Sequence, residues 1–170
     1  MNTYLLLSIA GAVFFSVCLA LLIIKFGIPE SLSDSYYNLG GKQGKGILLY
    51  GILAITAFTM LAPLVEAARI WGFLCAASLL FVGAAPAFKK DGSGSLDPII
   101  HIVSTIVCAA CSLAVLIRIN LWWMGIITLA IAAGLAIWTK TYKKCYIFWL
   151  EMAAFYGLFA GIITHFATAQ

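Results

Sequence analysis

The sequence predicts an all-α integral membrane protein, a single transmembrane domain (residues 1–170) built as a bundle of about six helices. Two observations predict this class. The 170 residues are 64% hydrophobic and only 9% charged, with a mean hydropathy of +1.09, whereas a soluble domain carries roughly 25% charged residues. In addition, the apolar residues gather in six runs, each close to the about 20 residues that a spanning helix needs. A chain this poor in charge cannot cover a folded surface with polar groups, so we expect its outer surface to face lipid.

The six apolar runs are predicted to be helices because, in hydrocarbon, a helix satisfies every backbone N–H and C=O of a single segment. The predicted helices are residues 4–24, 47–65, 70–88, 98–117, 121–138 and 146–166. No Lys or Arg precedes the first run, so it is interpreted as a retained helix and not as a signal peptide. The polar loop 89–97 could divide the bundle into two halves of three helices, inverted relative to each other.

The basic residues are distributed unequally between the two ends of this bundle. The connections 25–46, 89–97 and 139–145 carry eight lysines, whereas the turns at the opposite end carry only Arg69 and Arg118. The positive-inside rule therefore predicts that these three loops are cytoplasmic and that both the N- and C-termini lie outside, in the periplasm. The short loops favour a bacterial inner membrane. The net charge of +4 includes no long basic run, so no nucleic-acid partner is expected.

The first connection is the longest, and residues 29–40 within it are predicted to form a short helix. Pro29 stands at its start and Gly40 at its end, as is typical of helix boundaries. Leu32, Tyr36 and Leu39 would share one face, so this helix is expected to lie on the membrane surface. The alternative is a solvated linker.

The helix at 98–117 carries a polar stripe, because its polar residues recur at steps of three and four and so share one face. The stripe consists of Asp97, His101, Ser104, Thr105, Cys108, Cys111 and Ser112. Cys108 and Cys111 are interpreted as small packing residues, since an apolar site disfavours the thiolate that a redox motif needs. The last helix carries a sparser stripe that begins at Glu151.

If these faces converge, they form a cytoplasm-facing polar pocket between the second, fourth and sixth helices. The predicted ligand-binding residues are Asp97, His101, Ser104, Thr105 and Glu151. Ionisable groups inside membranes are costly and often functional. Glu151 would bind a cation or proton, and His101 would orient a solute or relay a proton. Alternatively, Glu151 lies at headgroup depth and pairs with Lys143 or Lys144.

The leading functional hypothesis is therefore small-solute or ion transport, or ligand binding, with membrane lipid and a small solute or cation as partners. A chain this short often needs a second copy to enclose a pathway, so a homodimer is also expected. One alternative is an intramembrane lipid-modifying enzyme with a metal held by His101, Asp97 and Glu151. Another is a structural or accessory subunit. No phosphate-binding Gly loop, H-E-x-x-H or G-x-S-x-G motif is present, so no catalytic residue and no cofactor are assigned.

Overall fold

The computed structural model describes residues 2–35, 39, 47–88 and 96–168, and the regular secondary structure of this part of the chain is entirely helical. The elements are α1 (Thr3–Phe26), the 3-10 helix η1 (Leu32–Asp34), α3 (Ile47–Ala68), α4 (Ile70–Phe88), α5 (Leu96–Arg118), α6 (Trp122–Trp138) and α7 (Tyr146–Thr168). The prediction of an all-α chain is thus confirmed for the described residues. Each end of the six α-helices lies within three residues of the end expected from the sequence.

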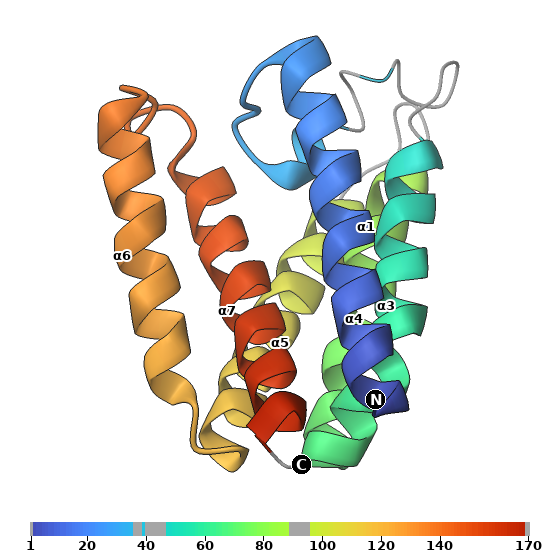
Figure 1. Cartoon of the computed structure of the whole chain (residues 1–170). Helices are drawn as coiled ribbons and strands as arrows, with labels where there is room; N and C mark the ends of the chain where they lie inside the picture. The colour runs from blue at the N-terminus through green and yellow to red at the C-terminus, as the bar shows by residue number, and fades with distance from the viewer. Residues whose placement is uncertain (1, 36–38, 40–46, 89–95, 169–170) are drawn as a thin grey trace.

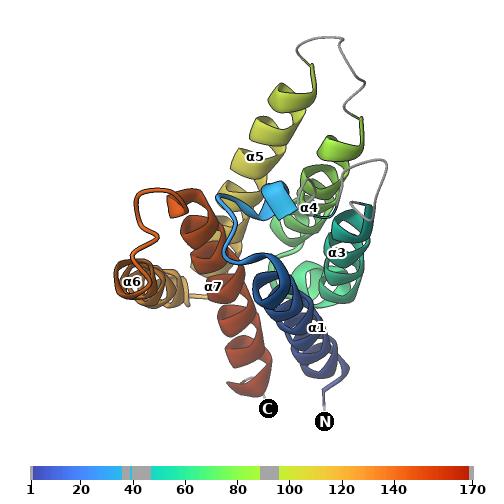
Figure 2. The ribbon, with the colours of Figure 1, turned by 90° about the horizontal axis from the view of Figure 1, so that it is seen from above.

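The helices run alternately up and down, so the bundle has two distinct ends (Figure 1). We call one the loop end: it holds the segment that follows α1 and the connection between α6 and α7. The other, the terminus end, holds both chain termini and the turns at Arg69 and Asn120. Five helices form a connected bundle, in which α4 packs on α3 and α5, and α1 packs on α3 and α7. The sixth, α6, packs mainly on α7 and lies at the edge of the molecule (Figure 2).

Three helices are long and apolar enough, by length and composition, to cross a membrane. They are Thr3–Phe26, Leu48–Ala68 and Tyr146–Thr168. The remaining helices contain shorter apolar stretches at Ile70–Gly83, Ile102–Arg118 and Trp122–Trp138. All six present large apolar side chains outward, such as Val13, Phe58, Phe81, Ile106 and Ile137. Such a surface fits a lipid environment and not water, because soluble monomers rarely expose large contiguous apolar patches.

The turns at the terminus end are tight, and α6 ends in a similar local turn. Arg69 alone separates α3 from α4, with φ of 50°. Asn120 and Lys140 each have φ of 57° and end α5 and α6 in the same way. In both, the N–H of the left-handed residue and the N–H of the next one bond back into the last helical turn (Leu121 N to Leu116 O, 2.8 Å; Thr141 N to Ala136 O, 3.0 Å). This pattern is the Schellman motif, which satisfies carbonyls at a helix end.

The segment after α1 differs in part from the predicted surface helix. Residues 27–35, which we call the docked segment, turn back onto the loop end of the bundle; in them, Leu32–Asp34 form η1 and Ser35 is α-helical. Leu39 N donates to Ser35 O at 3.0 Å, which is the bond of one helical turn within the predicted range. Leu32 is 3% exposed and belongs to the hydrophobic core. It therefore packs inside the protein and not on a membrane surface. Tyr36 and Gly40, also part of the predicted helix, lie outside the described residues.

Candidate functional site

An elongated cavity of about 260 Å³ lies between α3, α4, α5 and α7. Its lining includes the exposed residues Ala109 of α5 and Leu150 of α7, so the cavity opens to the outside between these two helices. Its wall on α3 runs from Leu49 to Leu64, and its wall on α7 runs from Ile147 to Phe159. At 1.5 Å per residue the α3 wall covers about 22 Å of helix. Leu32 and Ser33 of the docked segment line the cavity at the loop end.

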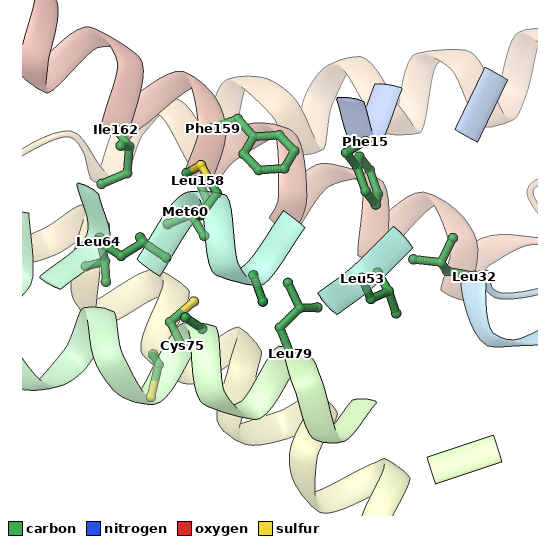
Figure 3. Close-up of a cluster of buried hydrophobic side chains, with 14 of the residues drawn as sticks. Phe15, Leu32, Leu53, Met60, Leu64, Cys75, Leu79, Leu158, Phe159 and Ile162 are labelled. Atoms are coloured by element: carbon green, nitrogen blue, oxygen red, sulfur yellow. The ribbon is translucent and has the colours of Figure 1, made fainter. Parts of the chain in front are cut away.

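Most of the lining is apolar, as the close-up of the core shows (Figure 3). The labelled side chains that line the cavity come from the docked segment, α3, α4 and α7: Leu32, Leu53, Met60, Leu64, Cys75, Leu79, Leu158 and Phe159. These side chains form the wall because residues at a period of 3.6 share the inward face of each helix. The other faces meet lipid or a neighbouring helix. An apolar cavity stays dry and can take an apolar ligand.

Two groups of polar side chains interrupt this wall. The first lies between α4 and α5, where the Cys75 Sγ and Ser112 Oγ atoms are 3.3 Å apart and Ser112 Oγ donates to the Cys108 carbonyl at 2.8 Å. The Cys108 thiol points to the Cys75 carbonyl, with 3.8 Å between the atoms. These contacts join α4 to α5, in agreement with a packing role for Cys108.

The second group is at the loop end and is centred on Glu151. The Glu151 Oε2 atom accepts a hydrogen bond of 2.6 Å from the backbone N–H of Leu32. Two further bonds hold the docked segment to the start of α7: Phe148 N donates to Glu30 O at 3.1 Å, and the Cys145 thiol donates to Ile28 O at 3.6 Å. The first of these satisfies one of the N–H groups that a helix N-terminus leaves without an intrahelical partner. Glu151 thus has a structural contact and also lines the cavity.

The predicted site residues are distributed unequally with respect to this cavity. Thr105 and Glu151 line it, whereas Ser104 is half-buried on α5 and does not. The side chains of Asp97 and His101 lie outside the described residues. The structure therefore brings Thr105 and Glu151 to one cavity. Among the described residues it contains no group of three or more His, Cys, Asp or Glu side chains that could hold a metal.

The whole α4 wall of the cavity was missed by reasoning from sequence. Cys75, Ala76, Leu79 and Val82 line the cavity, but an apolar residue that faces a cavity is indistinguishable in sequence from one that faces lipid. The docked segment was also missed, because Leu32 and Glu151 are 119 residues apart. On α3, Thr56 is fully buried and lines the cavity.

A second hollow lies on the side of the bundle, where α6 diverges from α5. It is lined almost entirely by apolar residues of α5, α6 and α7, including Leu113, Ile126 and Leu150. Leu113 and Ile126 are exposed, so this hollow is part of the outer surface. It adjoins the opening of the central cavity, with which it shares Ala109, Ser112, Leu150 and Ala154. We regard it as a lipid-facing groove and not as part of the site.

Comparison with protein families, with characterised proteins and with solved structures finds no match to this chain. Any function must therefore be argued from the cavity and from the residues that surround it.

Proposed function

We propose that this chain is a polytopic membrane protein that binds a small, largely apolar solute inside its helix bundle, as the binding step of transport. The observation that carries this proposal is the central cavity of about 260 Å³ with a single carboxylate, Glu151, among its described lining residues. Small-molecule sites are typically concave and mostly apolar, with a few polar groups that orient the ligand. Given that lining, an apolar solute is favoured over a bare ion, because an ion would need several polar partners to replace its water.

The size of the cavity limits the solute. Its volume of about 260 Å³ is near the lower end of the roughly 300–1,000 Å³ that is usual for ligand pockets, so a small solute is favoured. A membrane phospholipid is far too large to enter completely.

All six α-helices are proposed to cross the membrane, with the loop end in the cytoplasm. α4 and α5 have 19 and 23 residues, and α6 has 17, which corresponds to about 28, 34 and 26 Å of helix. A hydrocarbon core is about 30 Å thick, and a slightly short helix is accommodated by local thinning of the bilayer. Lys25, Lys140, Lys143 and Lys144 at the loop end support the orientation. In a bacterium this membrane would be the inner one.

The test is native mass spectrometry of the gently purified protein, compared with an Ala76→Phe variant. Ala76 is 3% exposed and lines the cavity, so a benzyl group there fills the space that the solute would occupy. The matched control is Ala130→Phe, at an exposed position of α6. We expect a small bound molecule on the wild type and on the control, and none on Ala76→Phe. Equal loading of wild type and Ala76→Phe would contradict the proposal.

A structural or accessory subunit is the second candidate, and one observation favours it. Several polar side chains simply join helices: Thr128 Oγ1 of α6 donates to the Ala153 carbonyl of α7 at 2.9 Å, and Tyr156 donates to Ser16 of α1 at 3.0 Å. If purified wild type bound no small molecule and gave no solute flux in liposomes, a structural or accessory role would replace solute binding as the proposed function.

A further inference from the structure

Resting on the proposed binding function, we propose that the solute is an uncharged, hydrocarbon-soluble molecule that enters the cavity laterally, from the interior of the bilayer, through a window between α5 and α7. The argument starts from the exposure of the lining residues. Among those that the structure describes, the lining residues of the docked segment, α3 and α4 are all buried or half-buried. The exposed ones all belong to α5 or α7, and they define the window: Ala109, Ile147, Leu150 and Ala154.

The depth of the window places it in hydrocarbon when α5 and α7 cross the membrane. The middle residues of these helices are 107 and 157, so Ala109 and Ala154 lie only two and three residues from them. The exposed side chains beside Ala109 on α5 are also apolar, as Ile106 (62% exposed) and Leu113 (53% exposed) show. A solute that leaves the window therefore meets lipid chains and not water.

The loop end of the cavity is covered by the docked segment in the part of the chain that the structure describes. Leu32 lines the cavity there and is 3% exposed. The hydrogen bonds of Ile28, Glu30 and Leu32 to α7 hold this cover in place. At the opposite end, Leu64 of α3 lines the cavity and is 2% exposed. The described residues thus enclose both ends of the cavity and leave its side open.

The lipid-facing groove between α5 and α6 leads to the same window. The groove and the cavity share Ala109 and Ala154, whose methyl groups leave more room between α5 and α7 than larger side chains would. Because apolar surface is expelled from water, a bilayer concentrates hydrocarbon-soluble molecules beside this opening. A charged molecule is disfavoured on this route, since a charge in the hydrocarbon core is costly.

The experiment uses a probe that cannot leave the membrane, a phosphatidylcholine with a diazirine at the methyl end of one acyl chain. The protein is placed in nanodiscs that contain this lipid and irradiated, and the adducts are located by peptide mass spectrometry. On α4, Cys75, Ala76 and Leu79 face the cavity and are at most 8% exposed, whereas Phe73 and Phe81 are exposed on the outside. We expect adducts on both sets of residues in the wild type, and an excess of 1-hexanol should reduce only those on the cavity side.

Two variants of α5 locate the path. In Ala109→Trp, an indole at the window should lower the adducts on the cavity side of α4 at least tenfold and leave those on Phe73 and Phe81 unchanged. The matched control is Ala110→Trp, since Ala110 is exposed and lines neither the cavity nor the groove. It should be labelled like the wild type. If Ala109→Trp does not fold, the presence or absence of cavity-side adducts in the wild type still decides.

The outcomes separate this inference from the function on which it rests. If 1-hexanol binds the wild type saturably but the lipid probe leaves no adduct on the cavity side of α4, lateral entry is wrong while the binding function stands. Unchanged cavity-side adducts in folded Ala109→Trp would also overturn the window. If cavity-side adducts form but 1-hexanol neither binds nor competes with the lipid, the window stands and the small-solute function is wrong.

Discussion

Gly72 is the glycine between α3 and α4 that leaves the least room for a larger side chain. A Cβ atom built there would overlap the carbonyl oxygen of Leu64 on α3, a backbone atom that cannot rotate away. The single-residue turn at Arg69 brings the two helices this close. Small residues at such positions allow helix backbones to approach each other in membranes.

We therefore expect Gly72→Ala to lower the free energy of unfolding by about 2–3 kcal/mol, since overpacking forces the backbones apart. The matched control is Gly134→Ala on α6, where an added Cβ meets nothing within 4 Å. Here the better helix propensity of Ala should stabilise the protein by up to about 1 kcal/mol. Thermal unfolding in the same lipid or detergent measures both changes. A neutral or stabilising Gly72→Ala would show that the helices are farther apart than described.

Cys145 is the titratable residue that reports on the docked segment. Burial raises the pKa of its thiol, and the nearby charge of Glu30 raises it further, while Lys144 acts in the opposite direction. A raised pKa leaves less reactive thiolate at a given pH, and the rate of modification should increase as the pH rises towards that pKa.

At pH 7 we expect maleimide to modify Cys145 at least tenfold more slowly than a cysteine introduced by Lys143→Cys, an exposed neighbour. Peptide mass mapping distinguishes the two sites within one protein. If Cys145 reacted as fast as the introduced cysteine, the contact between its thiol and the Ile28 carbonyl would not exist in solution.

At the scale of elements, the docked segment depends on Glu151. The Leu32 N–H lies in a residue that is only 3% exposed, so loss of its acceptor would leave a buried donor without a partner. A hydrogen bond to a charged group contributes about 1.5–3 kcal/mol. In Glu151→Ala we expect residues 28–35 to detach and their amide hydrogens to exchange at least tenfold faster.

Hydrogen–deuterium exchange measured by mass spectrometry tests this prediction, with Glu30→Ala as the control. The Glu30 contact to α7 uses its backbone carbonyl, so loss of its side chain should leave exchange in 28–35 almost unchanged. If Glu151→Ala behaved like Glu30→Ala, the docked segment would be held by apolar contacts alone.

The contrast between α7 and the docked segment shows what can be predicted from sequence. The long apolar run of α7 predicts a helix without reference to the rest of the chain, because in lipid its backbone must bond within itself. Leu32 could not be placed in this way, since its burial depends on a helix more than 100 residues later. Glu151 was predicted to be a ligand-binding residue, but the amide that it binds could not be predicted. The cavity could not be predicted from the sequence, because it is a space that the side chains of four helices leave unfilled.

At the scale of the whole molecule, the alternating direction of the helices predicts that the two ends of the bundle lie on opposite sides of the membrane. Arg69 and Arg118 lie at the terminus end and Lys143 at the loop end. In right-side-out vesicles, a membrane-impermeant maleimide should therefore label Arg69→Cys and Arg118→Cys from one side and Lys143→Cys from the other. Labelling of positions 118 and 143 from the same side would show that α6 does not cross the membrane, which the six-span arrangement requires.

The central claim is that the space between α3, α4, α5 and α7 binds a small solute, and the most direct measurement uses a neutral probe. Equilibrium dialysis of 1-hexanol against nanodiscs would compare wild type, Ala76→Phe and Ala130→Phe. We predict saturable binding of about one molecule per chain to the wild type and to Ala130→Phe, and loss of this binding in Ala76→Phe. Equal binding to all three proteins, or no saturable binding to the wild type, would contradict the claim.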